Sequence, residues 1–392
     1  MADLDLLIRS KGGRFALEKA KGELGELVGY FHGYLQETLE LWQTSGPLVL
    51  SAAFRDTTFA FLSERALDCF VYPGGRGNFV GMSVGYPLIL ANTCFALLAH
   101  PEVLPEVGNT GAETRWSPEA VLPKTQSAKQ LDLSTDDLRQ AGFFRLPRDP
   151  ERLRYATDLT LDALTFLLYH EIAHIFRGHM HVHRQATGFS FLDESEALLP
   201  TSAFGFDVPV GEASVTAGEL TQFFEIDADA VAADTLMYEK APMDFPESAG
   251  RFEEIVARLN RALVAVAILF MTTATPRSLT QYRTSKYPHP RTRYQLAFVF
   301  ATSTVIRLLK LPDHDRSLPE LRRLLAPAIG AIKTIRARLN WADSIGDEPD
   351  EAFAADFDDR HAFHGRIQDR LFVGKSTLAP LDGGGDPTPA GS

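Results

Sequence analysis

The sequence is poor in several features that define large classes of proteins. Two of its 392 residues are cysteines, Cys69 and Cys94, which is too few for a disulfide framework and favours a reducing compartment. Basic residues are outnumbered by acidic ones, 39 against 51, and the net charge of −12 gives no support for nucleic-acid binding. There is no N-terminal signal core, and no apolar run reaches the roughly 18 residues of a membrane span. We therefore expect a cytoplasmic protein with no nucleic-acid partner and no membrane span.

The composition is that of a globular protein, with 45% hydrophobic and 23% charged residues. The length corresponds to one to three domains. We expect an N-terminal portion over 1–148 with a small sheet packed on the core, and a core domain over 149–340. An acidic segment over 341–372 follows, and residues 373–392, which are rich in Gly and Pro, are expected to be a disordered tail.

The first 150 residues mix helical and strand patterns. Apolar residues recur at mostly helical spacing over 14–42, and 86–100 has the character of an apolar helix. Residues 68–83 are typical of a strand pair around the turn Pro73–Gly77. Residues 101–150 are rich in Pro and polar residues, so we expect them to be irregular apart from a short helix near 136–141.

The middle of the chain is predicted to be helical. Asp149 and Pro150 are suited to open a long helix that Gly178 can end in the left-handed conformation. Thr216 and Glu219 form a capping-box pattern before a second helix that runs to about residue 238. Two more helices are expected, over 252–273 and after Pro290. Together these patterns predict a predominantly helical α+β fold.

One short motif in the first of these helices carries chemistry. His170-Glu171-Ile-Ala-His174 places two imidazoles four residues apart, on one face of the helix, where both can bind the same ion. Glu171 is rotated about 100° around the helix, so it can reach a water molecule without ligating the metal. The alternative is an ordinary helix with two histidines at its surface or in the core. Two buried histidines without a partner are costly, however, and this favours the metal site.

Catalytic zinc usually has three protein ligands, so a third must come from elsewhere. Residue 180, where a metzincin would supply a histidine, is Met180. A carboxylate can come from the second helix, in which Glu225 and Asp229 share one face. Glu225 would bind the ion, and Asp229 would accept the outer N–H of a ligating imidazole. The alternative for this acidic pair is a solvated helix face. We interpret Asp227 and Asp234 as structural or solvated residues.

These motifs resemble those of the gluzincin metallopeptidases, in which HExxH is followed by a Glu in an ExxAD-type helix. The sequence Tyr287-Pro-His289-Pro-Arg291-Thr-Arg293 is similar to the His-Pro element of CAAX-protease-like gluzincins and their soluble relatives. HExxHxxxGH, which ends at His179, resembles the Lit phage-exclusion peptidases. The resemblance covers roughly 150–300. It implies a zincin-like core with an active-site helix, a second ligand helix and a small edge sheet.

The resemblance also implies a mechanism. One Zn²⁺ per chain on His170, His174 and Glu225 would activate a water molecule, with Glu171 as general base. His289 is the candidate donor to the developing oxyanion; its alternative role is to shape the His-Pro turn. The remaining candidates, for contacts with substrate or with acidic groups near the site, are Tyr287, Arg291 and Arg293, with Tyr282 as a further candidate oxyanion donor.

The position of a substrate is predicted less directly. Phe79–Ser83 is the candidate edge strand that pairs with an extended peptide, and 180–215 can cover the cleft. His179, His181 and His183 alternate, which is compatible with a second metal site, but solvated histidines are the favoured interpretation.

The predicted function is therefore a zinc-dependent endopeptidase that acts on intracellular proteins, as in phage exclusion. The first alternative is a catalytically silent regulator or sensor that keeps the metallopeptidase fold. The second alternative is a metal-free helical interaction protein.

Overall fold

The structure is a computed structural model. It describes residues 2–19, 22–45, 55–64, 67–74, 77–115, 145–180, 182, 192–193, 207–210, 213–241, 249–273, 288–308, 314–339 and 350–371. The short helix expected near 136–141 and the tail expected over 373–392 lie outside these residues.

A four-stranded mixed sheet is built mainly from the N-terminal part of the chain. Its strands are β1 (Thr57–Leu62), β2 (Cys69–Gly74), β3 (Gly77–Ser83) and β4 (Leu192–Asp193), in the order β1-β3-β2-β4. β2 and β3 are antiparallel, which confirms the expected strand pair, while β1 runs parallel to β3. β3 therefore lies inside the sheet, and the prediction that Phe79–Ser83 is an edge strand is wrong. The prediction failed because β1, which covers that edge, was not recognised in the sequence.

A long central helix, α7 (Pro150–Phe176), carries the HExxH motif. The Asp149 carboxylate accepts hydrogen bonds from the backbone N–H groups of Glu151 and Arg152, and Pro150 occupies the first helical position. Beyond the last turn, Gly178 has φ +73°, the left-handed conformation that glycine adopts at helix ends. Both predicted helix boundaries are thus confirmed, with the physical causes that the sequence indicated.

Helices account for most of the remaining described residues, which confirms a predominantly helical α+β fold. The others are α1 (Ala2–Ser10), α2 (Gly22–Ser45), α4 (Gly85–Leu98), α9 (Ala217–Lys240), α10 (Ala249–Thr273), α12 (Pro290–Leu308), α13 (His314–Arg338) and α15 (Asp350–Leu371). A short hairpin, β5 (Asp207–Val210) and β6 (Ala213–Thr216), precedes α9. The sequence did not predict α1, α13 or α15, and it began α2 too early, since 17–19 form a 3₁₀ turn.

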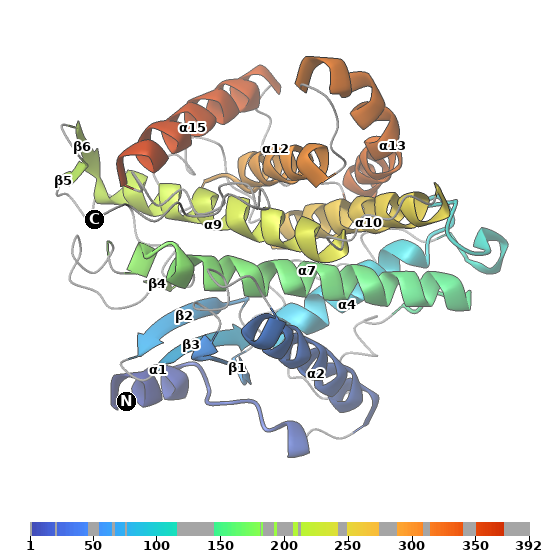
Figure 1. Cartoon of the computed structure of the whole chain (residues 1–392). Coiled ribbons are helices and arrows are strands. Elements are labelled where there is room, and N and C mark those ends of the chain that lie inside the picture. The colour runs from blue at the N-terminus through green and yellow to red at the C-terminus, as the bar shows by residue number, and fades with distance from the viewer. Residues whose placement is uncertain are drawn as a thin grey trace, which may run out of the picture.

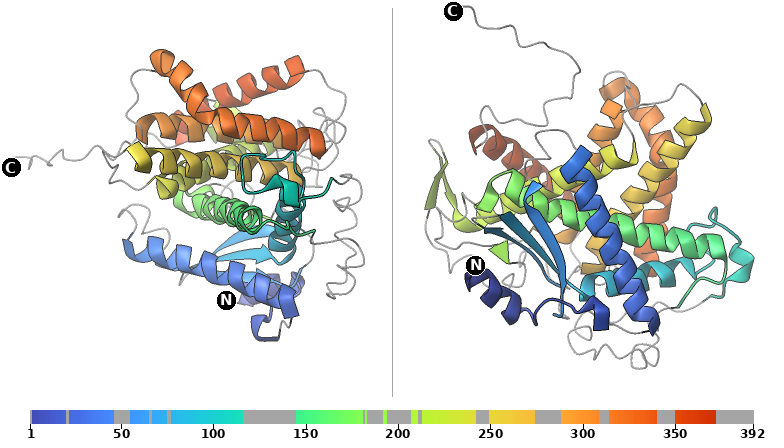
Figure 2. Two further views of the ribbon diagram at one scale, coloured as in Figure 1. Left: turned by 90° about the vertical axis from the view of Figure 1, so that its right-hand side faces the viewer. Right: turned by 60° about the horizontal axis from the view of Figure 1, so that its bottom comes forward.

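The elements are layered around α7 (Figure 1). The sheet and α2 lie on one side of α7, α9 and α10 lie on the other, and α12, α13 and α15 form an outer layer. Figure 2 shows the same arrangement from two further directions. One hydrophobic cluster runs through these layers, from Val28 and Phe31 in α2 to Ile332 and Ile335 in α13. The N-terminal portion therefore packs directly on the helices that carry the motifs.

Among the described residues, α10 is the one helix long and apolar enough to cross a membrane by length and composition. Within Phe252–Thr273, 72% of the most apolar stretch of 18 residues is buried inside the structure. It packs against α7, α12 and α13, an environment typical of a core helix.

Candidate metal centre

The candidate site lies where α7 and α9 pack closely together. Small residues mediate the contact, because Ala173 of α7 clusters with Ala228 and Val231 of α9. The start of α9 is fixed by the predicted capping box, in which Thr216 and Glu219 bond each other's backbone N–H groups. These features bring the motifs of the two helices, 170–174 and 225–229, face to face.

Three side chains converge at this contact. His170 Nε2 lies 3.2 Å from His174 Nε2 and 3.4 Å from Glu225 Oε2, and His174 Nε2 lies 3.6 Å from Glu225 Oε1. All three side chains are buried, with exposed fractions of 1–2%. The candidate ligand atoms lie within 4.8 Å of one another, which makes these residues a possible metal-binding cluster.

The separations agree with a tetrahedral ion site. Two ligand atoms, each about 2.0–2.1 Å from a zinc ion, are about 3.3 Å apart when they subtend a tetrahedral angle. The three observed distances lie close to this value. Two imidazole nitrogens and a carboxylate also match the donor types of catalytic zinc sites. The residues present therefore fit a zinc ion, with one position left for water or substrate.

A carboxylate and a guanidinium support this cluster from α9 and α12. Asp229 Oδ1 lies 2.9 Å from His170 Nδ1, the ring nitrogen opposite the one that faces Glu225. Arg293 donates to both carboxylate oxygens of Asp229, at 2.7 and 2.9 Å, and its Nη2 lies 3.3 Å from Glu225 Oε2. Asp229 thus lies where the sequence analysis expected it, and Arg293 contacts two acidic side chains of its own chain.

Burial and neighbouring charges shift the pKa values of all three side chains in the cluster. Burial lowers the pKa of His170, but hydrogen bonds with Asp229 and Glu225 outweigh it and raise the value to about 10. Burial dominates at His174, whose pKa falls well below its usual range. Burial raises the pKa of Glu225, yet the hydrogen bond to His170 and the charge of Arg293 bring it to about 2. Glu225 is therefore ionised at neutral pH and available as a ligand.

Of the other predicted site residues, some are described and buried, and others lie outside the described part of the chain. Glu171 is buried in α7, with 3% of its surface exposed. His289 is also buried, and its Nδ1 accepts a hydrogen bond from the Arg291 backbone N–H at 3.0 Å, at the start of α12. The His-Pro element therefore shapes this helix start, which is one of the two roles expected for His289. Burial and the charge of Arg291 lower the pKa of His289 to about 3. Tyr287 and Tyr282 lie outside the described residues.

A second group of buried polar residues adjoins the cluster, and the sequence analysis missed most of it. His174 Nδ1 contacts His179 Nδ1 at 3.0 Å, and His179 Nε2 contacts Asp227 Oδ2 at 3.0 Å. Arg177 and His364 also bind Asp227. His179 has 0% exposure, so its interpretation as a solvated histidine is wrong. His181, His183 and most of 180–215 lie outside the described residues.

Only part of this second group had a signal in the sequence. His179 belongs to the HExxHxxxGH pattern, and Arg177 stands where a metzincin has glycine. His364 is 137 residues from Asp227 and lies in a segment notable only for its acidic residues. Such a contact depends on where α15 packs, which local patterns do not reveal.

The chain was also compared with protein-family models, with curated proteins and with solved structures, and none of these comparisons gives a match.

Proposed function

We propose that this chain is a zinc-dependent endopeptidase of the gluzincin type, with one zinc ion held by His170, His174 and Glu225. The observation that carries the proposal is the convergence of these three buried side chains at separations close to those of a tetrahedral site. The order of the motifs, and a glutamate directly after the first histidine, support peptidase chemistry. Metal binding alone does not require Glu171.

Each side chain of the site has a separate role in the proposed hydrolysis of a peptide bond. A zinc ion at this site supplies Lewis acidity toward a water molecule and toward the carbonyl group of a peptide bond. Glu171 takes a proton from the attacking water and returns it to the leaving amine. Arg293 and Asp229 hold the carboxylate of Glu225 and the ring of His170 in place.

His289 is the proposed donor to the oxyanion. Because its Nδ1 accepts the Arg291 N–H, the ring hydrogen of the neutral imidazole resides on Nε2, which can donate. The low pKa keeps this ring neutral, and the bond to Arg291 fixes its orientation. A neutral, preoriented donor stabilises developing negative charge without reorganisation during the reaction.

Substrates are proposed to be cytoplasmic proteins or peptides, and a role such as phage exclusion rests on the motif resemblance. Protein substrates must present an extended segment to a site buried between helices. In the described sheet the outer strands are β1 and the two-residue β4. Because β3 is paired with a strand on both sides, a substrate peptide cannot pair with β3.

The test compares cells that express the wild-type chain, Glu171→Gln or Glu151→Gln, by proteomics of newly formed protein N-termini. Glu171→Gln should retain zinc but lose cleavage by roughly 100-fold or more, because the general base is gone. Glu151 is exposed at the start of α7, so its variant is a matched control that should cleave normally. Cleavage retained in Glu171→Gln would show that Glu171 is not the base. Zinc binding without cleavage by the wild-type chain would favour the silent regulator.

A further inference from the structure

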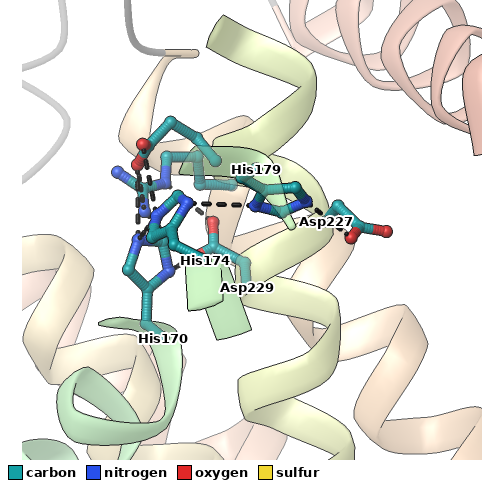
Figure 3. A network of polar contacts seen from close by, with 7 residues as sticks. His170, His174, His179, Asp227 and Asp229 are labelled. Carbon is teal, nitrogen blue, oxygen red and sulfur yellow. Dashed lines mark hydrogen bonds and ion pairs between the residues drawn. The ribbon is translucent and has the colours of Figure 1, made fainter. Parts of the chain in front are cut away.

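The two proposed imidazole ligands are supported in different ways on their outer sides. His170 Nδ1 faces a carboxylate directly, that of Asp229 at 2.9 Å. His174 Nδ1 instead faces a second imidazole, that of His179 at 3.0 Å, and only the far nitrogen of His179 reaches a carboxylate, Asp227. Figure 3 shows this line from His174 through His179 to Asp227 beside the direct contact of His170 with Asp229.

The hydrogen positions along this line follow from simple rules. Two neutral ring nitrogens 3.0 Å apart require one donor and one acceptor. If His174 binds an ion through Nε2, its hydrogen is on Nδ1, so Nδ1 of His179 must be the acceptor. The hydrogen of His179 then lies on Nε2 and is donated to Asp227 Oδ2 at 3.0 Å. Every group on the line is satisfied, and each imidazole is neutral.

The far end of the line is held by two elements besides α9. Arg177, directly after α7, binds Asp227 through Nε at 2.6 Å and Nη2 at 3.0 Å. His364 of α15 binds the other carboxylate oxygen of Asp227, with Nε2 at 3.1 Å. All these side chains are buried, at 8% exposure or less. Asp227 is therefore neutralised by a guanidinium, which makes a second metal site at this carboxylate unfavourable.

Aromatic contacts fix the two outer imidazoles. The ring of His179 stacks on Phe224 with centroids 4.6 Å apart, and the ring of His364 stacks on Phe223 with centroids 5.3 Å apart. Phe223 and Phe224 directly precede Glu225 in α9. The two aromatic residues that pack against these imidazoles therefore lie next to the proposed third ligand in the same helix.

We propose that His179 and Asp227 are positioning residues of the metal centre, forming a histidine relay that fixes the His174 ligand, and that α15 belongs to this centre through His364. The proposal rests on the proposed zinc site. Its physical basis is that a hydrogen bond to the outer nitrogen of a ligating imidazole sets the tautomer and orientation of the ring and raises its basicity.

The first test measures zinc affinity of the full chain by competition with a chromophoric chelator. His179→Phe removes both nitrogens and keeps an aromatic ring against Phe224, so zinc affinity should fall roughly 10–100-fold. His179→Gln keeps an acceptor and a donor and should recover part of this loss. Zinc affinity of His179→Phe within about twofold of wild type would overturn the relay. A wild-type chain that binds no zinc would instead overturn the proposed function.

The second test isolates the contribution of α15. His364→Phe should weaken zinc binding less than His179→Phe does, by roughly 3–10-fold, because it acts through Asp227. His361 lies three residues earlier on α15 and is exposed, so His361→Phe is the matched control and should bind zinc like wild type. Equal zinc affinities of the two variants would remove α15 from the centre.

A third measurement needs no substitution in the relay. In the zinc-loaded wild-type chain labelled with ¹⁵N-histidine, ring-nitrogen correlations should show His174 as the Nδ1–H tautomer and His179 as the neutral Nε2–H tautomer. A His179 ring that is doubly protonated, or that carries its hydrogen on Nδ1, would contradict the relay even if the variants failed to fold.

Discussion

The two halves of α7 both bury charged residues, but they balance them in opposite ways. Near its N-terminus, Arg152 has 0% exposure and satisfies its guanidinium with five hydrogen bonds to backbone carbonyl groups. The acceptors are Leu98, His100, Val103, Leu104 and Val107. Next to the middle of the helix, Asp162 binds Arg261 at 2.8 Å and Lys240 at 2.9 Å. In this half, Arg152 therefore has a full set of hydrogen-bond acceptors, and Asp162 has two basic partners.

The C-terminal half is arranged differently. Nε2 of His170 and Nε2 of His174 point toward each other and toward the same carboxylate, that of Glu225. Once His170 gives up the proton that its raised pKa retains, two imidazole nitrogens and a carboxylate present electron pairs to one point there, whereas in the first half donors meet acceptors. A buried polar network whose hydrogens and charges simply pair off is structural, whereas one in which several possible ligand atoms converge on a single point is a candidate metal centre.

The largest effect is expected from removing the guanidinium of Arg152, which makes five hydrogen bonds to backbone carbonyl groups. Arg152→Met leaves five carbonyl groups in the fold without their donor, so the free energy of unfolding should fall by about 3–5 kcal/mol. Urea denaturation measures the loss. Arg154, exposed two residues further along α7, provides the matched control, because Arg154→Met should change stability by less than about 0.5 kcal/mol. A similar small change for Arg152→Met would show that the first half is not the structural one.

A pH-dependent prediction concerns Asp234, which lies on α9 beyond the cluster of His170, His174 and Glu225. Burial raises its pKa to about 6, against the opposing charge of Arg307. The folded state then binds more protons than the unfolded state between pH 4 and pH 6, so this residue makes stability fall as pH rises through that window. In Asp234→Asn the fall should be smaller by about 2–3 kcal/mol.

Urea denaturation at several pH values from 4.5 to 7 checks this prediction. The exposed Asp358 of α15 supplies the control variant, Asp358→Asn, whose profile should match that of wild type. Identical profiles for Asp234→Asn and wild type would mean that Asp234 ionises in the fold without cost.

The smallest expected effect concerns the two cysteines, which belong to the apolar packing on the sheet side of α7. Cys69 and Cys94 have 0% exposure, and burial raises the pKa of the Cys94 thiol to about 12. Neither should react with a thiol reagent at pH 8 in the folded chain, and both should react once urea unfolds it. Rapid labelling of the native chain would contradict this packing.

The sequence predicted features whose causes are local. The cap at Asp149, the turn at Gly178 and the capping box at Thr216 each depend on residues within one helical turn, and all three are present. The spacing of the two motifs likewise indicated which residues share a helix face. Spacing alone did not bring the two helices together: the need for a third ligand and the resemblance to the gluzincin motifs led to the cluster of His170, His174 and Glu225.

Features that depend on distant packing were not predictable. β1 is recognised as a strand through its parallel pairing with β3, and parallel partners are not joined by a short hairpin turn that would reveal them. The contact between His364 and Asp227 requires α15 to lie against α9 and α12. The internal position of β3 and the full relay beside His174 both follow from such long-range contacts.

We have proposed that His170, His174 and Glu225 hold one zinc ion. The most direct test is elemental analysis combined with zinc-edge X-ray absorption on the full chain, purified without chelators. We expect about one zinc per chain with nitrogen and oxygen neighbours at about 2.0–2.1 Å, including two imidazoles, and loss of this signal in Glu225→Ala. Absence of bound metal, sulfur neighbours at about 2.3 Å, or an unchanged spectrum in Glu225→Ala would contradict it.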